Sequence, residues 1–284
     1  MDPFDDLLRG VRADGALLGC SVFTSPETLR LAEGASLTLC VPLRGEVRIE
    51  QGSERWLLRE GETAVLRGPE PFVATDLATP ERDTTLMVGV YRVRGEVPRR
   101  LLRVLPPFLL LKEECDWNAT RDLLETHIGA TGPMRQIVLD RLLDWLLVCT
   151  LRAWFDRPEA DPPAWYHALG DEVTGPALRA MHEMPDRPWT LAGLAAEAGV
   201  SRTTLAKRFP ELVGESPMGY LTGWRMALAA DLLAESSATV ASIARRVGYA
   251  DAFAFSAAFK RARGVSPTAH RATATQGNRA VAAR

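Results

Sequence analysis

The sequence predicts an α+β protein of several domains, with a β-rich N-terminal part, a helical connector and an all-α C-terminal domain. Residues 16–93 consist of short apolar segments divided by Gly and Pro turns, which is typical of a β-sandwich or barrel. Residues 99–155 change to helical spacing. Residues 189–209 and 240–260 repeat one order of apolar positions around a glycine, which predicts two helix-turn-helix units.

In the N-terminal part, residues 2–10 are expected to form a short amphipathic helix. Seven strands are expected at residues 17–23, 36–42, 46–51, 54–58, 63–66, 72–75 and 85–91. The apolar run at residues 106–111 predicts either a strand or an apolar connector.

The connector is expected to contain helices at residues 118–128 and 133–155, with Pro133 suited to a first helical turn. The second helix has an apolar arc wider than one domain face needs. Residues 156–163 are charged and rich in proline, which predicts a linker. Residues 272–284 lack periodicity and are expected to be disordered.

The first helix pair is predicted from the residues around Gly199. Thr190 is placed to cap a helix, Gly199 supplies a turn with positive φ, and Ser201 caps the next helix. On that second helix Leu205 and Phe209 share the buried face. The polar face opposite them suits insertion into the major groove of DNA.

The second pair repeats this order around Gly248, with Asp251 as the next cap and Phe255 and Phe259 in the buried positions. A helix over residues 217–236 joins the two pairs. Arg225 on that helix is expected to pair with a carboxylate rather than with DNA. An ordinary helical bundle would also give apolar pairs, but it would not explain a repeat that includes both glycine turns.

The segments WTLAGLAAEAGVSRTTLAKRF, VASIARRVGYADAFAFSAAFK and KRARGVSP, taken together, resemble the AraC/XylS family of bacterial transcription regulators. The resemblance covers residues 173–270 and implies double-stranded promoter DNA and RNA polymerase as partners. It places recognition helices at residues 201–209 and 251–261. The expected DNA-binding residues are Ser201, Arg202, Thr203, Thr204, Ala206 and Lys207 on the first, and Asp251, Ala252, Phe253, Ser256, Ala257, Lys260 and Arg261 on the second.

Residues 44–72, which include REGETAVLRGP, resemble the cupin jelly roll. Metal-binding cupins use histidines on the barrel strands, and this chain has no histidine before His127. A histidine-based metal centre in the barrel is therefore excluded, and no cofactor is expected. The expected boundaries are 1–98 for a cupin-like sensor domain, 99–156 for the connector, 157–172 for a linker, 173–270 for the tandem helix-turn-helix domain and 271–284 for a disordered tail.

Charge divides the chain in the same way. From residue 176 onward there are 14 Lys and Arg against 8 Asp and Glu, a net charge of +6, and the preceding part has 20 against 28, a net charge of −8. A basic end fits a module that binds a polyanion. The acidic N-terminus lacks the apolar core of a signal peptide, so a cytoplasmic protein without membrane contact is expected.

The expected function is therefore regulation of promoters by a DNA-binding protein in response to a small-molecule effector or an oxidant. The resemblance implies a homodimer that pairs through the helices of the connector, and the alternative is that these helices only cover the barrel. Cys20 and Cys40 lie on expected strands and are the redox candidates, although cysteines of this kind are often only small core residues. The alternative class is a cupin enzyme, or a small-molecule-binding protein, that carries a DNA-binding domain to regulate its own gene. An architectural nucleoid protein would need recognition faces dense in Lys and Arg, which these are not.

Overall fold

The computed structural model describes residues 11, 21–23, 28–31, 35–77, 84–93, 95–112, 123, 126–127, 135–157 and 164–282. The chain divides into two compact units. The sheet unit comprises Val11–Arg94 and Leu101–Asp161, and the helical unit includes Gly95–Arg100 and Pro162–Arg284. The helix expected at residues 2–10 and most of that expected at 118–128 lie outside the described residues, as does Cys20.

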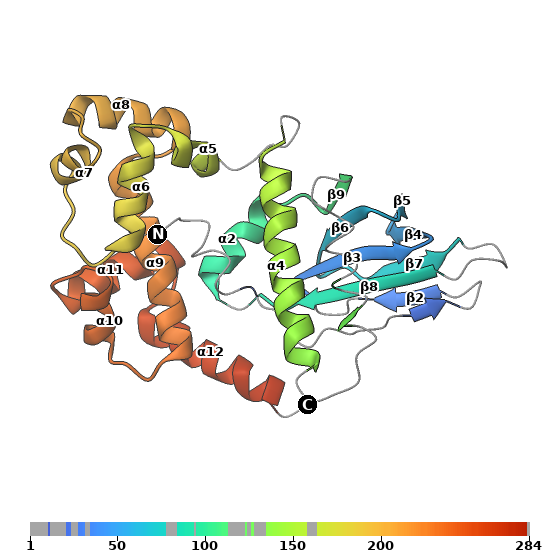
Figure 1. Ribbon diagram of the computed structural model, residues 1–284. Coiled ribbons are helices and arrows are strands. Elements are labelled where there is room, and N and C mark those ends of the chain that lie inside the picture. The colour runs from blue at the N-terminus through green and yellow to red at the C-terminus, as the bar shows by residue number, and fades with distance from the viewer. Residues whose placement is uncertain are drawn as a thin grey trace. The chain divides into compact units, whose positions relative to one another are not determined.

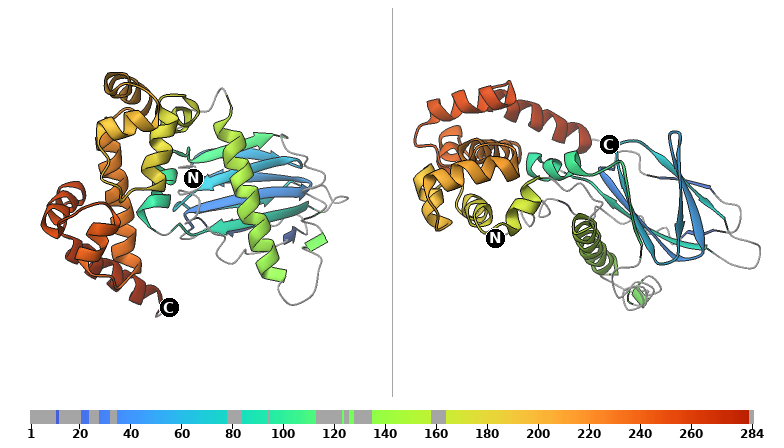
Figure 2. Two further views of the ribbon diagram at one scale, coloured as in Figure 1. Left: turned by 60° about the vertical axis from the view of Figure 1, so that its left-hand side comes forward. Right: turned by 90° about the horizontal axis from the view of Figure 1, so that it is seen from above.

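The sheet unit is built from two antiparallel sheets that form two layers, as the right-hand view of Figure 2 shows. The five-stranded sheet has the order β1 (Ser21–Phe23), β8 (Thr84–Tyr91), β3 (Leu37–Arg44), β6 (Glu62–Arg67) and β9 (Phe108–Lys112). The four-stranded sheet has the order β2 (Thr28–Leu31), β7 (Phe72–Asp76), β4 (Glu46–Gln51) and β5 (Glu54–Arg59). Side chains from both sheets, among them Cys40, Ile49, Phe72 and Val88, form one core between them.

The described strands match the sequence expectation with one addition, and the alternative left open at residues 106–111 is decided. The run at residues 106–111 is strand β9, paired with β6, rather than a connector. Strand β2 was not expected, because its four residues are too few to show a period. The strand with which it pairs among the described residues, β7, is more than 40 residues away in the chain.

Burial along β3 and β4 shows which sheet is covered on both faces. The side chains of β3 from Leu37 to Leu43 are all buried, whereas β4 alternates between buried and partly or fully exposed positions. The outer face of the five-stranded sheet is covered by α4 (Arg135–Phe155), which crosses its strands in the left-hand view of Figure 2. The Tyr91 hydroxyl donates a hydrogen bond to the Leu143 carbonyl at 2.7 Å.

Gly89 on β8 gives α4 room to approach the sheet. A Cβ atom at this position would lie 3.1 Å from the Leu143 side chain. Gly89 pairs with Leu39 of β3, so these two residues share the face on which α4 packs. The expected helix at residues 133–155 is therefore present from Arg135 onward and covers the sheet.

The helical unit contains a succession of short and long helices that follow one another along the chain (Figure 1). They are α5 (Ala164–Gly170), α6 (Thr174–Glu183), α7 (Leu191–Glu197), α8 (Arg202–Val213), α9 (Pro217–Glu235), α10 (Val240–Arg246), α11 (Ala252–Arg263) and α12 (Pro267–Ala282). The first residues of α2 (Glu96–Val104) also belong to this unit.

Helix α5 corrects the expectation of a linker over residues 157–172. Ala168 on α5 is fully buried in a cluster that also contains Leu178 and Leu205. Two prolines precede the helix and end the charged stretch, and the residues that follow them pack into the helical core. The expected linker therefore does not extend through residues 164–170.

Helix α12 corrects the expectation of a disordered tail, because it continues to Ala282. Its start repeats that of α9. Ser216 and Ser266 each accept a hydrogen bond from a backbone N–H three residues later, and Pro217 and Pro267 occupy the first turn. Beyond that start, Arg271 binds the carbonyl oxygens of Leu233 and Ala238, which fastens α12 to the end of α9.

Candidate nucleic-acid interface

The first helix pair consists of α7 and α8, and each helix begins with a side-chain cap. Thr190 accepts a hydrogen bond from the Gly193 N–H at 3.0 Å, and Ser201 accepts one from the Thr204 N–H at 3.1 Å. Between the helices Gly199 has φ of 66°, a conformation that favours glycine. These local features produce the helix-turn-helix that the sequence predicts.

The second pair, α10 and α11, repeats these features. Thr239 caps α10 by accepting from the Ser242 N–H, and Gly248 has φ of 80°. The Asp251 carboxylate accepts from the N–H groups of Phe253 and Ala254 at 3.1 and 2.9 Å. These hydrogen bonds lower the pKa of Asp251, and the one from Ala254 has the largest effect. The carboxylate therefore stays charged at neutral pH.

Each second helix is fixed by two fully buried side chains one turn apart. Leu205 and Phe209 anchor α8, and Phe255 and Phe259 anchor α11. Helix α9 contributes to both cores, with Tyr220 in the first cluster and residues from Met226 onward in the second. One continuous helix therefore carries both pairs.

Arg225 on α9 holds this arrangement at its middle. Its guanidinium donates to the main-chain carbonyls of Pro185 and Arg187, both at 2.7 Å. These partners differ from the carboxylate that the sequence predicts. The same guanidinium lies so close to Gly248 that a Cβ atom there would collide with it. Gly248 is thus required both for its positive φ and for this close approach.

The exposed face of α8 carries the residues expected there. Arg202, Thr203, Thr204, Ala206 and Lys207 are all exposed. Ser201 is also exposed, but its hydroxyl is engaged as the cap and lies 2.8 Å from the Thr204 hydroxyl. The face therefore offers hydrogen-bond donors and acceptors together with positive charge.

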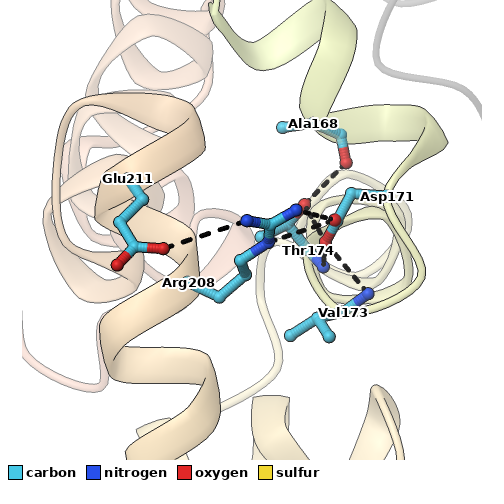
Figure 3. Close-up of polar contacts among 6 residues, drawn as sticks. All are labelled: Ala168, Asp171, Val173, Thr174, Arg208 and Glu211. Carbon is cyan, nitrogen blue, oxygen red and sulfur yellow. Dashed lines mark hydrogen bonds and ion pairs between the residues drawn. The ribbon is translucent and has the colours of Figure 1, made fainter.

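Arg208 is an exposed cation on α8 that was not among the predicted DNA-binding residues, and its side chain binds Asp171 (Figure 3). Its guanidinium donates to Asp171 Oδ2 at 2.9 and 3.2 Å. Asp171 Oδ1 accepts from the N–H groups of Val173 and Thr174 at the start of α6. Arg208 therefore fixes α8 to α6. No spacing in the sequence indicates this contact, because it joins residues 37 positions apart.

The exposed face of α11 differs from that of α8. Phe253 is 87% exposed, and Ala254 and Ala257 are exposed beside it. Ala252 and Ser256, which were expected to face outward, are only partly exposed, and Ala254 was not expected there. The positive charge of the predicted set lies at the end of the helix, on exposed Lys260 and Arg261.

Three further arginines lie on α10 and α11. Arg245 and Arg246 at the end of α10 are exposed and were not in the predicted set. Arg263, at the end of α11, is instead held inside the unit by an ion pair of 2.6 Å with Glu96. The neighbouring Glu96 N–H donates to the Asp231 carboxylate of α9 at 2.5 Å, so these contacts join the first turn of α2 to α9 and α11.

In the sheet unit, the described residues include no group of three His, Cys, Asp or Glu side chains that could hold a metal ion. Cys40 is fully buried in the core between the sheets. That burial raises the pKa of the Cys40 thiol well above its ordinary value, which keeps it protonated. Trp56 and Phe108 stack between the two sheets with ring centroids 4.0 Å apart.

Comparison with known proteins assigns both units to families. Residues 2–156, more than half of the chain, match the family described as Cupin, and residues 194–273 match the family described as Helix-turn-helix domain. A putative AraC-like transcription regulator of Streptomyces antibioticus is 30% identical over 95% of this chain and 98% of its own length. A Streptomyces lividans protein with the same description is 37% identical over 66% of this chain and 64% of its own length, so this chain spans somewhat less than two thirds of it.

The RCS-specific HTH-type transcriptional activator RclR of Escherichia coli (strain K12) is 35% identical over 80% of this chain and 81% of its own length. A cupin domain followed by capped helix pairs that match the helix-turn-helix family defines a DNA-binding regulator. The chain belongs to the AraC family of transcription regulators, among those with an N-terminal cupin domain. Among its described residues, no helix is both long and apolar enough to span a membrane.

Proposed function

We propose that this regulator binds double-stranded promoter DNA by placing α8 and α11 in successive major grooves on one face of the duplex. The supporting observation is the repeated geometry: two helix pairs with matching caps and glycine turns, both carried by α9. Helices that enter one face of B-DNA one turn apart contact half-sites about 34 Å apart. Footprinting of the full chain should show two protected segments with that spacing, and a single segment would contradict the proposal.

On α8 we assign base reading to Thr203 and Lys207, which are exposed on the outer face. Arg202, in the first turn, is placed to contact phosphate, as are Lys260 and Arg261 on α11. Side chains in the middle of an inserted helix meet base edges, whereas those at its ends meet the backbone. Arg208 is not proposed to contact DNA, because its guanidinium donates hydrogen bonds to Asp171.

Replacement of Lys207 by Ala tests the assignment. If Lys207 reads a base, the variant loses about 1–3 kcal/mol of binding free energy for the specific site and little for unrelated DNA. A contact to phosphate alone would instead lower both affinities together and flatten the dependence on salt. Titrations of duplex DNA at several salt concentrations separate these outcomes.

Arg55→Ala is the matched control, because Arg55 is an exposed cation on β5 of the sheet unit, with its side chain 74% exposed. This variant should bind DNA as the wild type does. If Lys207→Ala binds specific DNA as tightly as the control does, α8 is not inserted in the way proposed.

We infer that the cupin domain has a regulatory and not a catalytic role, and that its two sheets form a jelly roll. We also infer that the protein acts in the cytoplasm together with RNA polymerase. The relatives are transcription regulators, which supports this assignment. The signal is either a small organic effector or an oxidant. The protein is proposed to act as a homodimer through α4, whose outer face exposes Ile137, Val138, Trp145 and Val148.

A further inference from the structure

The exposed surface of α11 is apolar where a recognition helix would meet the bases. Phe253 is 87% exposed, more than any other exposed large hydrophobic side chain among the described residues. It is not needed for the core of this helix pair, since Phe255 and Phe259 fill that core and are fully buried. Together with exposed Ala254 and Ala257, Phe253 forms an apolar strip on α11 that is available for contact with another molecule.

The same surface has almost no group that could donate a hydrogen bond to a base. Residues 252–259 read AFAFSAAF, and the only hydroxyl among them, that of Ser256, belongs to a partly buried residue. The Asp251 carboxylate is occupied by the N–H groups of Phe253 and Ala254. Residues 252–259 of α11 therefore offer no Arg, Lys, Asn or Gln side chain for bidentate reading of purines.

Duplex DNA is the occupant that the surrounding charge favours. Exposed Lys260 and Arg261 follow on the same helix, and exposed Arg245 and Arg246 lie at the end of α10. These cations suit phosphates on either side of an apolar strip. An apolar docking site for a protein would not need them, so a protein partner is kept as an outcome of the test.

In the major groove, the thymine C5-methyl group is the apolar feature that distinguishes one base from another. We infer that α11 selects thymine through contact of Phe253 and Ala257 with C5-methyl groups, while α8 reads its half of the operator by hydrogen bonds. The two halves of the operator are then recognised by different chemistry. This inference rests on the proposed function, since it requires that α11 enters the groove.

The experiment uses the full chain and a duplex recovered from random sequences by selection with that protein. Each thymine in the duplex is replaced in turn by deoxyuridine, which removes only the C5-methyl group. One or two replacements in the half that α11 protects should each weaken binding roughly fourfold, which is the change in affinity expected for the loss of one buried methyl group. Replacements in the half that α8 protects should change affinity by less than about twofold.

Phe253→Ala assigns the contact to the side chain. The variant should bind the thymine duplex more weakly than the wild type does, and deoxyuridine at the sensitive position should weaken its binding no further. Lys207→Ala, a matched change on α8, should keep the full sensitivity to deoxyuridine. Because Phe253 is exposed, its replacement should leave the helical circular dichroism signal unchanged.

The outcomes separate this inference from the proposed function. If the wild type selects no duplex at all, the proposed function itself fails. If it binds a selected duplex without sensitivity to deoxyuridine, or if Phe253→Ala keeps that sensitivity, only the inference is overturned. If Phe253→Ala binds DNA normally but fails to activate or repress transcription, Phe253 contacts a protein, and the inference is again overturned.

Discussion

A single carboxylate, that of Asp171, sets the position of α8 relative to α6. It accepts hydrogen bonds from two N–H groups at the start of α6 and from the guanidinium of Arg208 (Figure 3). Burial alone would raise the pKa of Asp171, but the hydrogen bonds from Thr174, Arg208 and Val173 outweigh it and lower the pKa to about 2. The charged form is therefore the one that the fold stabilises.

This shift predicts a dependence of stability on pH. The folded pKa of Asp171 lies below its ordinary value of about 3.9, so its contribution is complete above about pH 4 and is lost as the pH falls towards 2. Asp171→Asn should remove that part of the acid sensitivity. At pH 7 the loss should stay below about 1 kcal/mol, because Arg208 is 46% exposed and water screens the pair.

Thermal unfolding followed by circular dichroism between pH 4.5 and pH 2.5 checks this prediction. The wild type should lose melting temperature more steeply than Asp171→Asn. Glu211→Gln is the control, since Glu211 contacts the same guanidinium only at 3.9 Å and is half exposed. Parallel curves for wild type and Asp171→Asn would show that the carboxylate does not titrate in this range.

The residues that could be predicted from the sequence are those whose role is local. Ser201 and Asp251 cap helices, and Gly199 and Gly248 supply turns, because these tasks depend on neighbours a few positions away. The contact of Asp171 with Arg208 joins distant positions, so no pattern reveals it. The exposure of Phe253 was predicted because its position follows from the helical period around Phe255.

At the scale of elements, the repeat in the sequence extends further than the two helix pairs. The order Gly-x-Ser-Pro precedes α9 at Gly214 and precedes α12 at Gly264, and both glycines have positive φ. A second copy of that start was the signal for α12. The helix was missed because the residues after Ala272 show no apolar period. It is held instead by the hydrogen bonds of Arg271 to α9 and to the turn that follows α9.

Helix α4 has two apolar faces, as its sequence predicts. Leu139, Leu143 and Leu147 are buried on the side that covers the five-stranded sheet. On the other side Trp145 is 48% exposed, and Val138 and Val148 lie within two turns of it. Helix α4 therefore covers the sheet with one face, and the other apolar face is left for the proposed pairing.

The outer face of α4 gives a prediction for the proposed dimer. Trp145→Glu places a charge in the centre of this face and should convert a dimer into a monomer, since an unpaired charge is costly in an apolar interface. Light scattering after size-exclusion chromatography measures the mass. Arg55→Glu, a change of charge at an exposed position on β5 of the sheet unit, should leave the mass unchanged. A wild type that is already monomeric would contradict the proposal.

For the whole molecule, the order of the domains and the class of each could be predicted, but the signal could not. Alternating strands and repeated helix pairs give regular patterns of apolar residues along the chain, which can be recognised in the sequence. An input site depends on which side chains meet inside the sheets, and these come from strands far apart in the chain. Cys40 illustrates the difference, since its strand was predicted but its complete burial depends on the packing of the opposite sheet.

The oxidant hypothesis therefore depends on whether a thiol can react in the folded protein. Cys40 is fully buried and its raised pKa keeps it protonated, so we expect it to react with iodoacetamide only after unfolding. Cys149 on α4, which is partly exposed, is the internal control and should react sooner. Mass spectrometry of digested protein after timed labelling measures both, and rapid labelling of Cys40 would show that its strand opens in solution.

Operator binding under hypochlorite or peroxide then identifies the input. If an oxidant is the signal, Cys20→Ser should lose the response, while Cys40→Ser should keep it because the buried thiol is not the first to be oxidised. A disulfide between the two would instead make both variants lose the response, and it would require Cα atoms within about 7 Å of one another. Responses identical to wild type in both single variants and in the double variant would end the oxidant hypothesis for these thiols. If the wild type itself responds to neither oxidant, the input is an organic effector or a partner protein.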